Sequence, residues 1–193
     1  MDKTQQRREL IKRRKQLTHV EIEAKSTRIL DHLDKSEIYQ TAKYVALYLA
    51  INGEADPRAL LNQSSIDKHF YLPVIDHSDG IKMHFAKYQL GDPLTPNEFG
   101  ILEPELTPES AIPVTKLDLV ITPLVGFDDR GNRLGMGGGY YDRTFAFKQN
   151  TDVTPYLMGF AYDFQSFEYI PENIWDVKLD GIATEKYVKK FHT

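Results

Sequence analysis

The sequence predicts an α/β fold, built as a single three-layer domain over residues 1–193 with a mainly parallel central sheet. Strand-like and helix-like segments alternate along the chain, which is typical of such sheets. The segment LDLVITPLVGF (117–127) is an almost continuous apolar run, as expected for a strand covered on both faces. No linker rich in Pro, Gly or Ser divides the 193 residues, a length that supplies the core of one domain.

The first 33 residues predict two helices. Thr18 and Glu21 form the T-x-x-E pattern of a capping box, which predicts the start of the second helix. Ile29, Leu30 and Leu33 follow at the spacing of one buried helical face.

Later segments predict the other strands and helices. Asp56-Pro57 resembles an N-cap followed by proline at the first helical position. Runs of β-branched and aromatic residues bounded by turn residues predict strands. Strands are expected at 43–51, 69–75, 81–88, 117–127, 156–164 and 181–185, helices at 57–63 and 140–149, a turn at Ser78-Asp79-Gly80, and an ordered loop with short pieces of structure at 89–116.

Composition and charge exclude several classes of protein. With 24 Lys and Arg against 28 Asp and Glu, the formal net charge is -4, whereas a general nucleic-acid binder needs a basic excess. The apolar stretches are too short to span a bilayer, and the basic N-terminus lacks the apolar region of a secretory signal. Cysteine is absent, which excludes disulfides and thiolate chemistry and favours a reducing cytoplasm.

A glycine-rich segment is the strongest sequence signal. Six of the twelve glycines fall between Gly126 and Gly139, in VGFDDRGNRLGMGGG. Glycine lets backbone N–H groups approach an anion closely, and the segment opens a predicted helix at the carboxyl end of a strand. The letters match neither G-x-G-x-x-G nor a Walker loop. The alternative is a flexible turn between strand and helix.

Charged residues flank this segment in a pattern that favours a nucleotide phosphate. Arg133 and Arg143 can donate to phosphate oxygens, and Asp142 follows the glycines. An acid beside a phosphate is explained by a bridging Mg²⁺ ion. Asp142 is equally explained as an acid in the first helical turn, where the helix dipole stabilises it.

The first helix is strongly basic. At 100° per residue, its inward stripe is predicted to carry both cations and apolar residues, whereas Arg8, Lys12 and Lys15 point the other way. A cation directed at the protein body requires a negative partner, so a negative ligand is expected against this face. Alternatively, the long side chains snorkel past the apolar rows to water. The stripe consists of Lys3, Arg7, Leu10, Arg14 and Leu17.

Other candidate side chains are less specific. Glu54 lies just past a predicted strand, where it either contacts a ligand or is an exposed turn acid. Asp176 and Asp180 either supply a second metal ligand or cap turns. Tyr140 and Tyr141 are suited to stack on a flat heteroaromatic substrate. The six histidines show no zinc spacing, and no nucleophile motif is present.

The segment RLGMGGGYYDR (133–143), following PLVGFDDRGN, resembles the signature of the 5-formyltetrahydrofolate cyclo-ligase (5,10-methenyltetrahydrofolate synthetase) family. The Lys3-x-x-x-Arg7 start, the strand ending near Glu54, YLPVI, FGILEP (99–104) and WDVKLDGIATE occur in the family's order, so the resemblance covers essentially the whole chain. Some members have basic residues where this chain has Met136 and Gly138, so phosphate contacts at those positions must come from backbone amides and neighbouring cations.

The resemblance implies a fold related to the ribose-5-phosphate isomerase and CoA-transferase group, in a cytoplasmic monomer. It implies conversion of 5-formyltetrahydrofolate, possibly polyglutamylated, and ATP into 5,10-methenyltetrahydrofolate, ADP and phosphate. It further implies ATP contacts at Lys3, Thr4, Gln5, Gln6, Arg7, Arg133, Leu134, Gly135, Met136, Gly137, Gly138, Gly139, Tyr140 and Tyr141. Folate contacts are implied at Arg7, Leu49, Glu54, Met136, Gly137, Gly138, Gly139 and Tyr140, catalytic roles at Arg7, Arg133 and Tyr140, and Mg²⁺ ligands at Asp142 and Asp180.

The mechanism implied by the resemblance agrees with the residue types present. The formyl oxygen is phosphorylated first, the N10 amine closes the ring, and phosphate departs. Such a reaction needs positioning and charge neutralisation more than a protein nucleophile. Two alternatives are a nucleotide- or folate-binding module without turnover, and a sugar-phosphate isomerase or CoA-transferase, which needs a catalytic carboxylate and no ATP.

Overall fold

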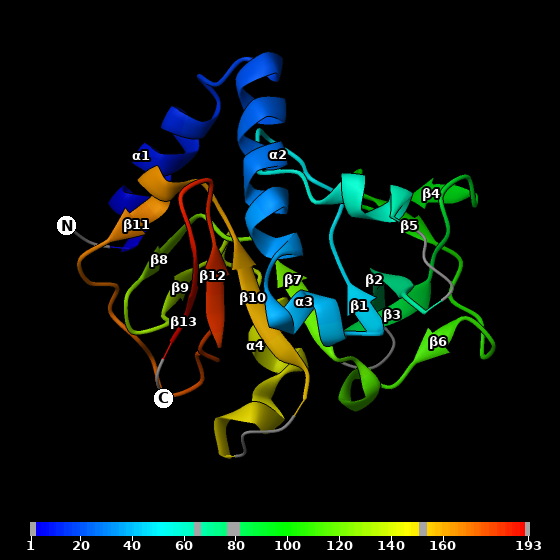
Figure 1. Ribbon diagram of the computed structural model, residues 1–193. Coiled ribbons are helices and arrows are strands. Elements are labelled where there is room, and N and C mark those ends of the chain that lie inside the picture. The colour runs from blue at the N-terminus through cyan, green and yellow to red at the C-terminus, as the bar shows by residue number, and fades with distance from the viewer. Residues whose placement is uncertain (1–2, 64–66, 77–81, 151–153, 192–193) are drawn as a thin grey trace.

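The computed structural model describes residues 3–63, 67–76, 82–150 and 154–191, and these residues form an eight-stranded mixed sheet (Figure 1). The predicted turn at Ser78-Asp79-Gly80 lies outside the described residues. Along the sheet the strand order is β13-β12-β10-β7-β1-β2-β3-β6. The strands are β1 (Tyr44–Ala46), β2 (His69–Asp76), β3 (Lys82–Lys87), β6 (Ala111–Ile112), β7 (Leu119–Thr122), β10 (Tyr156–Phe160), β12 (Gly181–Ala183) and β13 (Val188–Lys190).

The centre of this sheet is parallel and its edges are antiparallel. Strands β12, β10, β7, β1 and β2 pair in parallel. Strand β13 at one edge, and β3 and β6 at the other, pair antiparallel with their neighbours. The prediction of an α/β fold with a mainly parallel central sheet is therefore confirmed.

Two apolar cores cover the two faces of the sheet. On one face, Val45 and Leu47 pack with the helices α2 (His19–Asp34) and α3 (Glu37–Thr41) and the short helix η1 (Arg58–Asn62). On the other face, Ala46 belongs to a core shared with α4 (Tyr140–Thr144) and η3 (Ala146–Asn150). Alternate residues of one strand thus point into opposite layers.

Helix α2 begins where the sequence predicts. The Thr18 side chain accepts a hydrogen bond from the Glu21 backbone N–H, and the Glu21 carboxylate accepts from the Thr18 backbone N–H at 2.8 Å. This capping box satisfies backbone donors at the free end of the helix. Ile29, Leu30 and Leu33 are buried, as expected for its inner face.

Helix α1 (Lys3–Arg14) lies against a second, three-stranded sheet formed by β11, β8 and β9 (Figure 1). These strands span Gly126–Asp128 (β8), Arg133–Leu134 (β9) and Ser166–Phe167 (β11). Gln6, Leu10 and Arg14 are buried, and Leu10 packs with Leu134 of β9. Arg8, Lys12 and Lys15 are exposed, so the predicted orientation of the helix is correct.

Several predicted boundaries are wrong. The run 117–127 is split between β7 and β8, which belong to different sheets, because Pro123 cannot donate to a ladder. The strand predicted at 43–51 is regular only over β1. The helix predicted at 140–149 breaks at Phe145, and the strand predicted at 156–164 ends at Phe160.

The remaining elements are short. The helix predicted at 57–63 is the 3-10 helix η1, and a further 3-10 helix, η4 (Asp163–Gln165), follows β10. The predicted loop 89–116 contains β4 (Leu94–Pro96), β5 (Leu102–Pro104), β6 and η2 (Val114–Lys116). In the described part of the chain, no helix has the length and apolar character needed to cross a membrane.

Candidate active site

A cavity of about 940 Å³ opens at the carboxyl ends of the parallel strands. Tyr48 and Leu49 line it just after β1, Ile75 near the end of β2, and Pro123 and Leu124 after β7. Ligands of open α/β sheets bind at this edge, and the volume matches that of a small-molecule site.

The glycine loop (Gly135–Gly139) forms one wall of this cavity. Gly137 has φ 106° and Gly139 has φ 66°, backbone conformations that favour glycine. A Cβ atom added at Gly135 or Gly137 would meet no atom within 4 Å, so this stretch of backbone borders open space. Gly139 is the N-cap of α4. The loop can therefore present backbone groups to a ligand without side chains between them.

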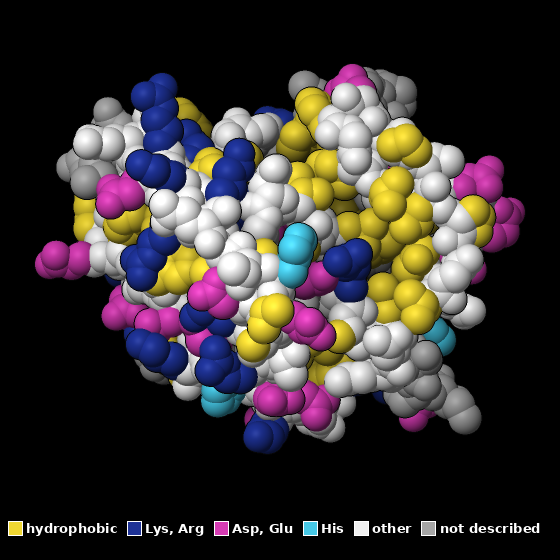
Figure 2. All heavy atoms as spheres, turned by 90° about the horizontal axis from the view of Figure 1, so that it is seen from above, with side chains coloured by type: hydrophobic (Ala, Val, Ile, Leu, Met, Phe, Trp, Pro, Cys, Tyr) yellow, Lys and Arg dark blue, Asp and Glu magenta, His cyan; other side chains and the backbone are white. Residues whose placement is uncertain are grey.

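Helix α1 reaches this loop through Arg7. The Arg7 Nε donates to the carbonyl oxygen of Gly135 at 2.7 Å. Two segments separated by 128 residues in the sequence thus form one wall, as the inward-facing basic stripe predicts. Seen from above, Lys and Arg side chains gather on the α1 side of the molecule, and hydrophobic side chains gather towards β4 and β5 (Figure 2).

The inward cations of α1 differ in their partners. Lys3 forms an ion pair with Asp176 at 3.2 Å, and Arg14 forms one with Glu54 at 3.4 Å. The protein itself therefore supplies the negative partners of these two cations, for which the sequence favoured a ligand. Arg7 contacts a neutral carbonyl oxygen, and within the described residues it forms no ion pair with a carboxylate. Its positive charge remains available to an anion.

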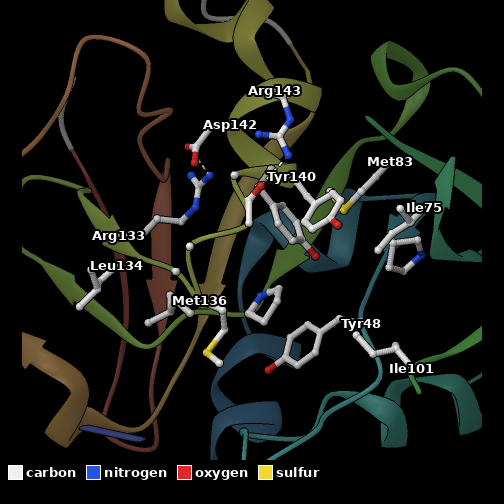
Figure 3. A pocket seen from close by; sticks show the side chains of 18 of the residues that line it. Tyr48, Ile75, Met83, Ile101, Arg133, Leu134, Met136, Tyr140, Asp142 and Arg143 are labelled. Atoms are coloured by element: carbon white, nitrogen blue, oxygen red, sulfur yellow. Dashed lines mark hydrogen bonds and ion pairs between the residues drawn. The ribbon is translucent and has the colours of Figure 1, made fainter. Parts of the chain in front are cut away.

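The buried Arg133 guanidinium pairs with the partly exposed carboxylate of Asp142 beside the glycine loop (Figure 3). The Arg133 Nη2 lies 2.6 Å from the Asp142 Oδ1, and the Arg133 side chain is 6% exposed. The same guanidinium donates to the carbonyl oxygen of Val177, whose N–H donates to the Asp142 Oδ1 at 3.1 Å. Burial lowers the pKa of Arg133, and the Asp142 carboxylate opposes this shift.

Glu54 reaches the cavity from the loop after β1. It is 8% exposed, its Oε2 accepts from the Ile51 N–H at 3.1 Å, and its Oε1 faces Arg14. Burial raises the pKa of the Glu54 carboxyl, and Arg14 and the Ile51 N–H oppose that increase. Tyr48 lines the cavity nearby, and its hydroxyl donates to the carbonyl oxygen of Ala55.

The far side of the cavity is apolar. Figure 3 shows Ile75, Met83 and Ile101 at that side, with Tyr140 between them and the Arg133–Asp142 pair. The Tyr140 ring packs edge-on against Phe99 at a centroid distance of 6.4 Å. Sequence reasoning gave no functional role to this apolar side, because its residues come from separate strands and loops.

Most of the predicted site residues lie together. The cavity is lined by Lys3, Arg7, Leu49, Glu54, Arg133, Leu134, Gly135, Met136, Gly137, Gly138, Gly139, Tyr140, Tyr141 and Asp142. Thr4, Gln5 and Gln6 do not line it, and Thr4 and Gln5 are exposed on α1. Trp175 and Asp176 line it although the resemblance gave them no role.

Asp180 also lies away from this cavity. Its Oδ2 accepts from the Leu157 N–H at 2.6 Å and pairs with the Lys148 Nζ at 3.2 Å. Within the described ranges, no group of three or more His, Cys, Asp or Glu side chains could hold a metal ion.

A family model described as the 5-formyltetrahydrofolate cyclo-ligase family matches residues 1–185. The chain belongs to this family. It is 38% identical over 177 residues to the 5-formyltetrahydrofolate cyclo-ligase of Haemophilus influenzae, which covers 91% of this chain and 94% of that protein. It is also 38% identical over 148 residues to the enzyme of the same name from Escherichia coli K12. That match covers 76% of this chain and 80% of the Escherichia coli protein.

Solved structures agree with this membership. The solution structure of Aquifex aeolicus 5,10-methenyltetrahydrofolate synthetase matches with a TM-score of 0.85 and 30% identity, covering 100% of this chain and 94% of that one. A synthetase from Mycoplasma pneumoniae, 23% identical, shares the fold with a TM-score of 0.73. The match covers 96% of this chain and 99% of that one. The relation to the ribose-5-phosphate isomerase and CoA-transferase group stays a prediction, as does a single domain spanning residues 1–193.

Proposed function

We propose that this chain catalyses the ATP-dependent cyclisation of 5-formyltetrahydrofolate to 5,10-methenyltetrahydrofolate, with release of ADP and phosphate. Membership of the cyclo-ligase family supports the reaction. The observation that carries the proposal is the contact of Arg7 with the glycine loop. It places a cation that has no carboxylate partner among the described residues beside exposed backbone at the edge of a large cavity. We further propose that the protein is cytoplasmic, in keeping with its lack of cysteine, and that it is a monomer, as the family resemblance implies.

The triphosphate binds at the basic side of the cavity in this proposal. Backbone N–H groups of the glycine loop and the Arg7 guanidinium approach the phosphate oxygens. Arg133, which is paired with Asp142, lies on the same side in a buried setting, where a contact with a phosphate oxygen is stronger than in water. Lys3, Leu134 and Tyr141 line the same side and complete the proposed ATP contacts.

Asp142 fits Mg²⁺ as a single protein ligand. Mg²⁺ is often held by one or two carboxylates together with phosphate oxygens and waters, so a three-residue cluster is not required. The hydrogen bonds from Arg133 and Val177 both end on Oδ1, and Asp142 lines the cavity. When bound, the ion neutralises charge on the phosphates. Asp180 does not fit this role, because its Oδ2 already bonds to Leu157 and Lys148 away from the cavity.

The folate binds across the remainder of the cavity. Glu54 accepts hydrogen bonds from N–H groups of the folate, and Leu49 and Tyr140 supply apolar contact for its flat rings. Met136 and the neighbouring glycines border both ligands. This arrangement brings the formyl group next to the terminal phosphate of ATP.

The reaction proceeds through a phosphorylated formyl oxygen. That oxygen attacks the terminal phosphorus of ATP and ADP leaves; N10 then attacks the formyl carbon, loses its proton, and phosphate departs with the oxygen. Arg7 and Arg133 neutralise charge that develops on the transferred group, and Tyr140 helps to position the substrate and exclude water. No protein nucleophile takes part.

A spectrophotometric assay tests the proposal. Purified protein is incubated with 5-formyltetrahydrofolate and Mg²⁺, with and without ATP, and the methenyl product is followed by its absorbance. Product that depends on ATP is expected. ATP binding without any product would contradict the proposal and indicate a binding module.

A further inference from the structure

Arg14 is an almost fully buried cation at the end of α1. It is 2% exposed, and its guanidinium joins two of the loops that form the floor of the cavity. Nε donates to the carbonyl oxygen of Asn52 at 3.0 Å, and Nη1 lies 3.4 Å from both the Leu124 carbonyl oxygen and the Glu54 Oε1. The loop after β1 and the loop after β7 are thus held to one side chain.

Burying the Arg14 guanidinium opposes folding, which is unfavourable for a residue with a purely structural role. The Arg14 Nη2 is buried, and among the residues that the structure describes it has no hydrogen-bond partner. A buried charged group with an unsatisfied hydrogen-bond donor destabilises the folded state, and buried ion pairs often add little to stability. Within the described residues, the carboxylate of Glu54 is the negative group that faces this guanidinium, and that carboxylate lines the cavity.

We propose that Arg14 is a positioning residue for folate binding, which keeps the Glu54 carboxylate ionised and directed into the cavity. The inference rests on the proposed function and adds a residue that does not itself line the cavity. The two oxygens of Glu54 are divided between the Ile51 N–H and Arg14, so the pair fixes the orientation of the carboxylate.

Among the groups around Glu54, Arg14 is the one that most favours the ionised form of the carboxyl. From the strand side it faces Tyr48, and from α4 it faces Tyr141, neither of which carries a positive charge. Burial raises the pKa of Glu54, and Arg14 is the cation that opposes this increase. Without Arg14 the carboxyl would bind a proton more readily, and a protonated Glu54 accepts hydrogen bonds from folate N–H groups poorly.

The test compares Arg14→Met, Arg14→Lys and Glu54→Gln with Arg13→Met, a control on the exposed side of α1 whose guanidinium stacks on Phe164. Arg14→Met is expected to raise the KM for 5-formyltetrahydrofolate about tenfold or more, the effect of losing one charge-assisted hydrogen bond. The KM for ATP should stay within about twofold, and kcat should change less than the folate KM. Arg14→Lys should restore part of the loss.

The pH profile separates positioning from a general loss of structure. In Arg14→Met the acid limb of kcat/KM for the folate, after subtraction of the rate without ATP, should move to higher pH, because that limb reports the free enzyme. The double variant Arg14→Met/Glu54→Gln should be no worse than the poorer single variant, since both remove one interaction. Circular dichroism and urea unfolding verify that each variant folds. If Arg14→Met does not fold, the same comparison is made with Arg14→Lys, Glu54→Gln and their double variant.

Three results would overturn the inference: an unchanged folate KM in Arg14→Met, an equal rise in the KM for ATP, or an unmoved acid limb. Absence of product from the wild-type protein would overturn the proposed function instead. In that event, calorimetric titration with 5-formyltetrahydrofolate still tests Arg14, and equal affinity in wild type and Arg14→Met would contradict the inference.

Discussion

Gly137 has φ 106°, and an added Cβ would meet no atom within 4 Å, so a side chain at this position is opposed by backbone strain rather than by contact. Gly91 has φ 101° and the same open surroundings, but it lies in a turn away from the cavity. The two positions therefore separate the cost of strain, which they share, from the loss of function, which only the glycine loop should show.

Gly137→Ala and Gly91→Ala are each expected to lower the free energy of unfolding by about 1–2 kcal/mol, the usual cost of a left-handed residue with a side chain. Only Gly137→Ala should also lower kcat/KM for ATP, by about tenfold or more, because relief of strain moves the amides of the loop. Urea unfolding and steady-state kinetics measure the two effects. Equal kinetic losses in both variants would remove the loop from ATP binding.

Asp142→Ala should reduce product formation by at least about 100-fold at saturating ATP, since it removes the proposed Mg²⁺ ligand and leaves Arg133 buried without its carboxylate. The Mg²⁺ concentration that gives half-maximal rate should also rise. Asp129→Ala is the matched control, because Asp129 is an exposed acid paired with Lys189. Full activity of Asp142→Ala would exclude a role for Asp142 in holding the metal.

The helices and strands that position these residues differ in how strongly the local sequence determines where they begin and how they are oriented. The capping box fixes the start of α2, and the spacing of Gln6, Leu10 and Arg14 fixes the rotation of α1. Helix α1 packs on the small sheet through Leu10, and its rotation directs Arg7 to the glycine loop. The orientation of the element that carries the cations thus depends on the apolar packing of Leu10 together with the buried polar contacts of Arg14.

Thr18→Ala is expected to lower the free energy of unfolding by about 1 kcal/mol through loss of the cap. Activity should stay unchanged, because Thr18 does not line the cavity. Thr27→Ala, an exposed substitution inside the same helix, should be neutral or slightly stabilising, since alanine favours helices more than threonine. Urea unfolding of both variants measures the difference, and equal losses would show that the capping box contributes nothing.

Elements with a strong local pattern could be predicted from the sequence, and those set by distant partners could not. The capping box and the glycine cluster are local, so α2 and the loop before α4 are where the sequence predicts. The split of 117–127 depends on a second sheet whose other strands follow later in the chain. Short edge strands such as β13 and β6 gain their order from neighbours across the sheet and carry little pattern of their own.

The same division applies to the site. Helical spacing, position after a strand and glycine content pointed to Arg7, Glu54 and the glycine loop, the family resemblance added their roles, and the structure brings them to one cavity. The Arg14–Glu54 pair joins residues from different elements, and nothing in their sequence spacing signals the contact. Asp180 matched the family pattern, yet its side chain lies away from the cavity.

On the scale of the whole molecule, the cavity lies between segments that are far apart in the sequence. Its walls come from α1, the loops after β1 and β7, the glycine loop, and the segment around Phe99. A ligand that contacts all of these should therefore stabilise the fold as a unit, because binding to the folded state alone raises the free energy of unfolding.

ATP with Mg²⁺ at about 100 times its Kd should raise the free energy of unfolding by about 2.7 kcal/mol, which corresponds to about 5–10 °C in Tm for a chain of this size. Arg7→Ala should show a smaller rise at the same ATP concentration. Thermal unfolding followed by fluorescence measures both proteins. An equal rise in the variant would show that Arg7 does not contribute to ATP binding.

Binding of the ATP phosphates by the main chain of the glycine loop is tested most directly by NMR of protein labelled with ¹⁵N at glycine. The spectrum is recorded during titration with Mg²⁺ and a non-hydrolysable ATP analogue, in wild type and Arg7→Ala. The amide signals of Gly135, Gly137, Gly138 and Gly139 should shift at lower ligand concentration in wild type, while those of Gly91 and Gly181 stay in place. Signals of the loop that do not move while the analogue binds would contradict the account.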